Sequence, residues 1–185
     1  MKASEVKSGR SFAIAFEHGE DFMSSLARFC HDNEVRQGYI PMFLAGFAEA
    51  DVVGTCEKLD NPDAPVWSKV HVSNVEALGC GTIARDDADG ILPHIHASVG
   101  LKEHSATAHT SHLLAAKVQF LTEMIIVEID SPEMTRPRDH DLYDVPLLRF
   151  GYRSANPKLL GCGTQPTALT WAFASSKVMS SGYMA

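Results

Sequence analysis

Short apolar runs separated by polar breaks recur through the first 150 residues of this chain, and they constrain the fold more than any other feature. Val70 and Val72, for example, alternate with polar neighbours, as the residues of a half-buried strand do. We expect strands at residues 11–16, 39–47, 48–56, 66–72, 75–84, 92–101 and 146–150, with one or two more within residues 113–129. The chain therefore has the pattern of a sheet-rich domain.

Breaks between these runs carry turn residues. A bend at Gly46 is expected to separate the strands at residues 39–47 and 48–56. Residues 85–90 (RDDADG) end in Asp-Gly between two apolar runs, which predicts a hairpin turn. Three further connections are expected at residues 61–65, 104–112 and 134–144.

One segment has the spacing of an amphipathic helix. Apolar side chains follow one another at i, i+4, i+7 and i+8: Phe22, Leu26, Phe29 and Cys30. Asp21 precedes them and is a favoured residue for capping a helix N-terminus. The pattern predicts one helix that runs to about Asn33 and buries this face in the core.

The charge balance argues against direct binding to duplex nucleic acid. The formal net charge is -7 and the sequence pI is about 5.7, whereas phosphate contacts require a basic surface. The densest basic cluster, Arg136-Pro137-Arg138, is followed at once by acidic residues.

The four cysteines (Cys30, Cys56, Cys80 and Cys162) form no C-x-x-C pair, so a thiolate zinc site is not indicated. The first ten residues are polar and show no signal-peptide pattern, and no apolar run is long enough to span a membrane. We therefore expect reduced cysteines in a cytoplasmic protein. Cys80 as a nucleophile beside a histidine is an alternative without a supporting motif.

Histidines carry the clearest chemical signal. His94 and His96 form an H-x-H pair on an expected strand, where alternation places both rings on one face with Cα atoms ~6.6 Å apart. Two such rings can converge on one cation, with bonds of about 2.0–2.1 Å. The third ligand is left open between His109 and His112, which would share a face on a helical turn and oppose each other on a strand.

A three-histidine set with an open fourth position is the pattern of catalytic zinc, whose bound water can act as a nucleophile. Glu49, Asp51 and Glu123 are candidates for a base or a supporting carboxylate, and each could equally be a solvated or ion-paired residue. A purely structural role, in which the histidines form hydrogen bonds and hold no metal, also fits the sequence.

Residues 151–185 differ in composition from the rest, with few charges and several large apolar side chains. Disordered tails are usually more charged and less aromatic. We expect a domain at residues 1–150 and an extension at residues 151–185 that packs on this domain or on a neighbouring subunit.

Three segments in order resemble the plant- and prokaryote-conserved (PPC) domain: residues 93–99 (PHIHASV), 111–114 (SHLL) and 123–127 (EMIIV). Residues 19–21 (GED), ahead of the helix, and residues 76–79 (EALG) are also similar to family motifs. The resemblance covers about residues 10–130. Thr110-Ser111 stands where the family has paired glycines, and Ser73-Asn74-Val75 stands where it has Gly-Arg-Phe.

The resemblance implies an α+β single domain, with a mainly antiparallel twisted sheet, one main flanking helix and assembly as a homotrimer. It further implies zinc held by His94, His96 and His112. The chain has no Arg-Gly-Arg-Pro core, so it is similar to the stand-alone prokaryotic type without an AT-hook.

Two functions follow as hypotheses. The first is a trimeric zinc-binding protein that binds or turns over a small molecule; a zinc-assisted hydrolase or lyase is its sharper form, although three histidines alone specify no reaction. The alternative is a regulatory or assembly module, of the kind called DNA-binding, that acts through protein contacts.

Overall fold

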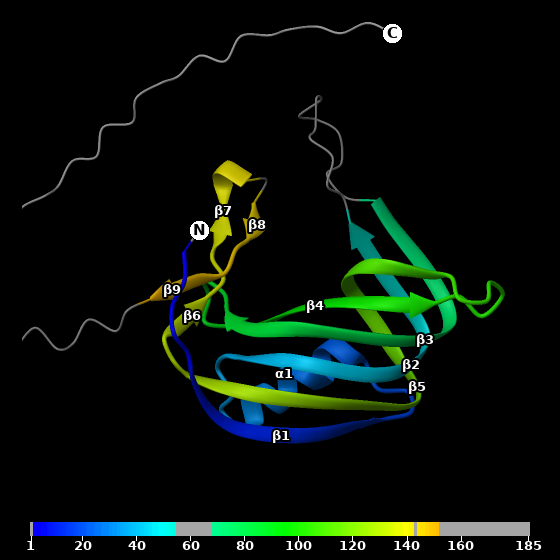
Figure 1. Cartoon of the computed structure of the whole chain (residues 1–185), viewed down its shortest axis with the longest axis horizontal. Coiled ribbons are helices and arrows are strands. Elements are labelled where there is room, and N and C mark those ends of the chain that lie inside the picture. Colours follow the sequence, from blue (N-terminus) through cyan, green and yellow to red (C-terminus); the bar gives the residue numbers. More distant parts are fainter. Residues whose placement is uncertain (1, 55–67, 143, 152–185) are drawn as a thin grey trace, which may run out of the picture. The chain divides into compact units, whose positions relative to one another are not determined.

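Mainly antiparallel strands and one helix make up the computed structural model, which describes residues 2–54, 68–142 and 144–151 (Figure 1). The elements are β1 (Lys7–Glu17), α1 (Phe22–Asp32), β2 (Gly38–Gly54), β3 (Ser68–Arg85), β4 (Ile91–Gly100), β5 (Ala108–Ser131), β6 (Glu133–Thr135), β7 (Arg138–Asp139), the 3-10 turn η1 (His140–Leu142), β8 (Val145–Pro146) and β9 (Arg149–Gly151). The predicted α+β class with a single domain is confirmed.

Four strands of the sheet close into a ring. The main sheet has the order β1-β5-β2-β3-β6-β9, and β4 pairs with both β3 and β5. Since β5 also pairs with β2, and β2 with β3, each of β2, β3, β4 and β5 has two neighbours within the ring. This closure brings β4 and the start of β5 together, far from β5's pairing with β1.

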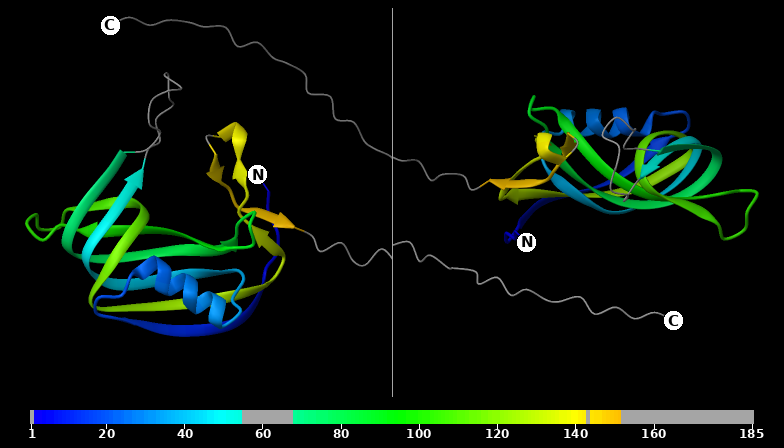
Figure 2. Two further views of the ribbon diagram at one scale, coloured as in Figure 1. Left: turned by 180° about the vertical axis from the view of Figure 1, so that it is seen from behind. Right: turned by 90° about the horizontal axis from the view of Figure 1, so that it is seen from above.

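The helix α1 lies across one face of this sheet (Figure 2). Asp21 caps it as predicted, because its carboxylate accepts a hydrogen bond from the Ser24 amide at 2.8 Å. Phe22, Leu26 and Cys30 on its inner side are fully buried. The predicted helix is confirmed, and it ends at Asp32, one residue earlier than expected.

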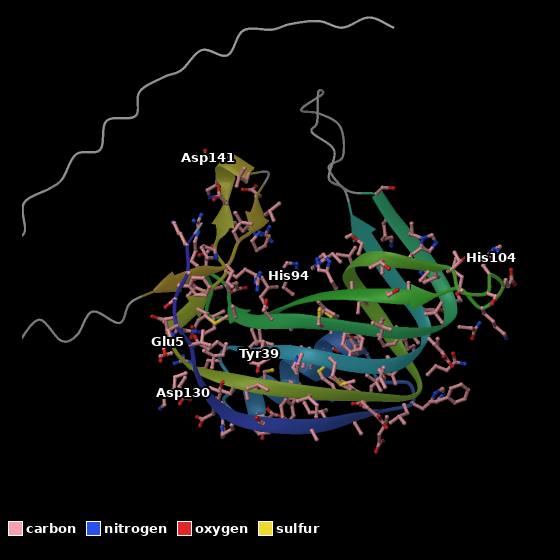
Figure 3. All side chains as sticks on the ribbon, in the orientation of Figure 1. Glu5, Tyr39, His94, His104, Asp130 and Asp141 are labelled. Atoms are coloured by element: carbon pink, nitrogen blue, oxygen red, sulfur yellow. The ribbon has the colours of Figure 1, made fainter. Side chains whose placement is uncertain are left out.

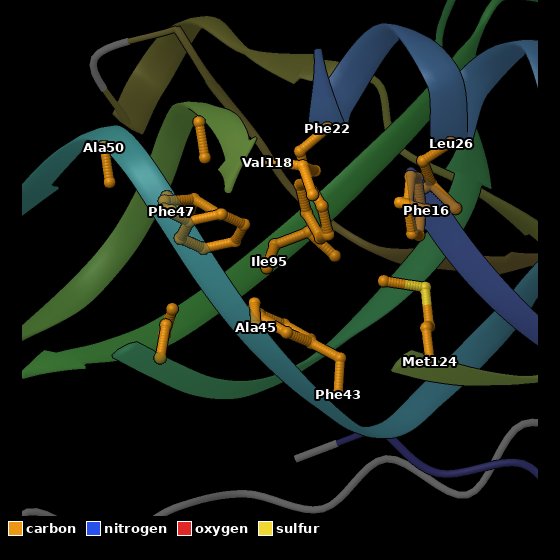
Figure 4. Close-up of a cluster of buried hydrophobic side chains, with 14 of the residues drawn as sticks. Phe16, Phe22, Leu26, Phe43, Ala45, Phe47, Ala50, Ile95, Val118 and Met124 are labelled. Atoms are coloured by element: carbon orange, nitrogen blue, oxygen red, sulfur yellow. The ribbon is translucent and has the colours of Figure 1, made fainter. Parts of the chain in front are cut away.

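Aromatic side chains fill the space between helix and sheet (Figure 4). The ring of Phe22 lies 5.3 Å from that of Phe43 and 5.4 Å from that of Phe47, in tilted and edge-on arrangements. Phe16 on β1 adds a third contact to Phe22 at 5.2 Å. These side chains form the centre of the hydrophobic core.

Two predicted breaks within strands are wrong. Residues 39–56 were expected to hold two strands, but β2 passes through Gly46 without ending. A Cβ at Gly46 would lie 2.5 Å from the Gln119 carbonyl oxygen, so this glycine permits a close approach of β5 rather than a turn. In the same way β3 continues through Asn74, which adopts a φ of 53°, where two strands were expected.

The connection predicted at residues 104–112 is also too long, because β5 already begins at Ala108. Pairing with β4 places residues 108–112 in the sheet, where Thr110 and His112 project to the open face opposite Ser98 and His96. The hairpin turn at residues 85–90 is confirmed, with a hydrogen bond from the Asp86 amide to the Gly90 carbonyl at 2.9 Å.

Residues 113–129 lie in one long strand, β5, with a left-handed residue at Phe120. The loop expected at residues 134–144 contains short pairings in β6 and β7, and the strand expected at residues 146–150 corresponds to β8 and β9. The turn at residues 61–65, Cys56 and Cys162 lie outside the described residues, as does nearly all of the predicted extension at residues 151–185. No helix in the described ranges is long and apolar enough to cross a membrane.

Candidate metal centre

Strand alternation on β4 places two histidines on the open face of the sheet. Ile95 is fully buried in the core beneath α1, so His94 and His96 on either side of it project to the opposite face. Figure 3 shows the His94 side chain rising from β4 on the side where the β7–β8 pair lies. The H-x-H arrangement predicted from the sequence is therefore present.

The register of β5 supplies the third histidine. His112 lies directly opposite His96 in the β4–β5 pair, and directly opposite residues share a face. His109 pairs with Val99, a core residue, and so belongs to the other face. The structure thus brings together His94, His96 and His112 and leaves His109 outside the group.

Distances within the group are those of a metal-binding set. One candidate ligand nitrogen from each ring lies within 4.8 Å of the others, and the Nε2 atoms of His94 and His96 are 3.2 Å apart. Two nitrogens bound to a tetrahedral zinc at 2.0–2.1 Å stand about 3.3 Å apart, which matches that pair. The Nδ1 atom of His112 is buried without a hydrogen-bond partner among the described residues. The donor set therefore fits a divalent transition metal.

Burial favours the uncharged form of His94 and of His112. Burial lowers the pKa of His94 to about 4, with further contributions from Arg136, His112 and His96. Burial also lowers the pKa of His112, and the neighbouring His96 and Arg136 contribute in the same direction. The neutral imidazole is the form that binds a metal, so these two rings need release no proton at neutral pH.

Arg136 is the group's unpredicted neighbour. It follows β6, its backbone amide donates to the Arg85 carbonyl at 2.7 Å, and its side chain reaches the histidines. One guanidinium nitrogen, Nη1, lies 2.9 Å from His94 Nδ1, and Nη2 donates to the Thr82 hydroxyl at 2.6 Å. In the sequence, Arg136 stood out only as part of the densest basic cluster, and no motif linked it to a histidine 42 residues away.

The other candidate residues lie elsewhere. Asp51 accepts hydrogen bonds from Lys69 at 3.1 Å and pairs with His71 at 2.8 Å. Within the described ranges no carboxylate joins the three-histidine group, so Glu49, Asp51 and Glu123 do not support it directly. Cys80 is exposed and lies opposite His96 in the register, but it too is outside the group.

Comparison with known proteins places this geometry in context. Residues 3–130 match the family model described as the Plants and Prokaryotes Conserved (PCC) domain. No curated protein matches the chain.

Several solved structures share the fold. A plant- and prokaryote-conserved (PPC) protein of Pyrococcus horikoshii is 17% identical, with a TM-score of 0.66 over 80% of this chain and 97% of the other. A metal-containing protein of Archaeoglobus fulgidus is 19% identical, with a TM-score of 0.66 over 80% and 98%. A candidate DNA-binding protein of Ralstonia eutropha JMP134 is 17% identical, with a TM-score of 0.61 over 74% and 89%. At these identities the likeness shows the fold.

Proposed function

The chain belongs to the Plants and Prokaryotes Conserved domain family, and from this premise we propose that it is a metal-binding protein whose centre is formed by His94, His96 and His112. The membership confirms the resemblance found in the sequence. The observation that carries the proposal is the convergence of three imidazoles from two strands, with two Nε2 atoms at 3.2 Å.

Zinc is the proposed metal. Neutral imidazole suits zinc, copper, nickel and iron, and a three-nitrogen set that leaves a position open is typical of zinc. The Archaeoglobus fulgidus protein with the same fold is described as metal-containing, which supports a metal in general. A bound zinc ion would supply Lewis acidity to a small ligand held beside it.

Elemental analysis of protein purified without a histidine tag tests the proposal. The wild-type chain should contain about one metal ion, and the His94→Ala/His96→Ala double variant should contain none, because a single remaining imidazole binds weakly. His109→Ala, on β5 but outside the group, is the matched control and should keep its metal. Full metal content in the double variant would refute the proposal.

We propose that the chain assembles as a homotrimer, as the family resemblance implies. Its support is an open sheet face with large exposed apolar side chains: Tyr39, Met42, Leu44, Leu78, Leu121 and Ile125. Leu44 and Leu78 are paired in the β2–β3 register and are 50% and 61% exposed. A contiguous apolar patch of this kind often marks an association surface.

Native mass measurement tests the assembly. Wild-type protein should have three times the mass of the 20.2 kDa chain, and a Leu44→Glu/Leu78→Glu variant should be monomeric because two carboxylates would be buried without partners. A monomeric wild-type protein would contradict it.

A second candidate, an assembly module that acts through protein contacts, is favoured by the same apolar face. Direct DNA binding, which the description of the Ralstonia eutropha protein suggests, conflicts with the net charge of -7. A mobility shift with duplex DNA that weakens steeply with salt would favour DNA binding, whereas its absence would favour protein contacts.

A further inference from the structure

Arg136 is a buried cation with no carboxylate partner in the described ranges. Its exposed fraction is 4%, and none of the ion pairs among the described residues includes it. Five arginines do contact a carboxylate: Arg10, Arg28, Arg36, Arg85 and Arg149. The guanidinium of Arg138 also has no carboxylate partner in the part of the chain that the structure describes, but it is exposed to solvent.

Arg85 shows how this chain accommodates a guanidinium that is largely removed from water. Its side chain is 16% exposed and contacts two carboxylates, those of Asp89 and Glu133. Arg136 is more deeply buried, yet its contacts are a neutral imidazole and a hydroxyl. Burying a charge is unfavourable unless an opposite charge offsets it. The described surroundings of Arg136 therefore contain no anion that contacts its side chain.

The missing partner belongs beside the histidines. Two nitrogens of Arg136 are used, by His94 and Thr82, while Nε is buried with no partner among the described residues. The side chains that line this position bring positive or neutral groups, and no carboxylate joins the three-histidine group within the described ranges. An anion bound here would balance the charge of Arg136 and accept a hydrogen bond from its Nε.

We propose that Arg136 and the three-histidine centre together bind a small molecule through an oxyanion, either a carboxylate or a phosphate group. The planar guanidinium fork matches both groups and can donate two parallel hydrogen bonds to either. The inference rests on the proposed function for the position of the centre, and it adds the chemical class of the ligand.

The direction of the hydrogen bond between Arg136 and His94 also supports oxyanion binding at this site. A guanidinium only donates, so His94 Nδ1 accepts, and the proton of neutral His94 lies on Nε2, facing His96 Nε2. In a metal-binding histidine, the ring nitrogen that does not bind the metal usually carries the proton and donates it to an acceptor. An oxyanion that accepts from Arg136 would release His94 Nδ1, so oxyanion binding and metal binding should reinforce each other.

Calorimetric titration of the full chain at constant ionic strength tests the inference, with acetate and inorganic phosphate as separate probes. We expect saturable binding of at least one probe, weakened tenfold or more by Arg136→Gln. The matched control Arg138→Gln, two residues along and exposed, should bind as the wild type does. The probe that binds more tightly identifies the group as carboxylate or phosphate.

No saturable binding by the wild type, or equal binding by Arg136→Gln, would overturn the inference. If Arg136→Gln does not fold, Arg136→Lys keeps the charge without the fork and should bind at least threefold more weakly; equal affinity there overturns the inference too. Metal content measured in the same samples separates the two proposals. Oxyanion binding through Arg136 without metal refutes only the metal proposal, and metal without oxyanion binding refutes only this one.

Discussion

The two faces of the sheet differ in what completes them. The face beneath α1 is closed by the protein itself, with Phe22, Phe43 and Phe47 packed ring to ring. The opposite face carries the three histidines, exposed leucines and a buried Arg136 that has no carboxylate partner among the described residues. One face therefore supplies folding free energy, whereas the other has polar groups that the described part of the chain leaves unsatisfied.

Strand β4 shows how one segment serves both faces. Ile95 is fully buried beneath α1, while its neighbours His94 and His96 point the other way. Side chains alternate with period two, so substitutions on the two faces should have separable effects. Each prediction below tests that separation.

The largest contrast is expected between Phe22→Ala and Leu78→Ala. Phe22 is fully buried, so its removal should lower the free energy of unfolding by about 3–5 kcal/mol. Leu78 is 61% exposed, so its removal should change this free energy by about 0.5 kcal/mol or less. Urea denaturation measures both, at a protein concentration where the oligomeric state of the two variants is the same. Equal losses would contradict the separation of the faces.

Gly79→Ala should have the next largest effect. A Cβ there would lie 2.4 Å from Phe43 Cζ and 2.5 Å from the His96 carbonyl oxygen, so it would overpack the covered face. We expect a loss of about 1–3 kcal/mol in unfolding free energy. Gly151→Ala is the control, because its Cβ would meet neighbours only at 3.7 Å or more. A neutral Gly79→Ala would show that the core tolerates the added methyl group.

Removing the cap of α1 should have a smaller effect. Asp21→Ala deletes the acceptor for the Ser24 amide and hydroxyl, and we expect a loss of about 1 kcal/mol in unfolding free energy. Asp21→Asn keeps a capping side chain and should remain close to the wild type. Thermal and urea denaturation of both variants measure the loss of stability. Metal content, measured in the same samples, reports on the histidines of the open face, and we expect it to be unchanged.

Acid should also lower stability, through a histidine on the open face. The folded pKa of His94, about 4, lies below its ordinary value of 6.5, so between these values the unfolded chain binds more protons than the native chain. The free energy of unfolding of metal-free protein should therefore fall as the pH decreases from 6.5 to 4. His94 is only half-buried, so solvent moderates the change.

Denaturation of chelator-treated protein at several pH values measures this slope, and His94→Gln should flatten it. A stability that rises as the pH falls through this window would contradict the burial of neutral histidines.

Sequence patterns predicted the covered face better than the open one. The helical spacing of Phe22, Leu26 and Cys30 and the cap at Asp21 are local signals, and local signals fix α1. Strand ends were less predictable: Gly46 indicated a break, but it serves the approach of β5 at a distance of more than 70 residues along the chain. The strand propensity of single residues does not reveal such tertiary pairing.

The residues of the candidate site also differ in how far local sequence signals predict them. His94 and His96 follow from alternation on a single strand, which the sequence shows directly. His112 required the family resemblance, because its position opposite His96 depends on the register between β4 and β5. Arg136 had no signal at all, since its contact with His94 arises from the path of the chain after β6.

The segment after β6, which carries Arg136, could change independently of the histidines. Arg136 lies beyond residues 3–130, which match the family model, whereas the three histidines lie within them. The ring of strands therefore sets the arrangement of the three histidines, and a short segment beyond it carries the nearby positive charge. Replacing that segment should change the selectivity of the proposed ligand site while leaving the framework that holds the histidines intact.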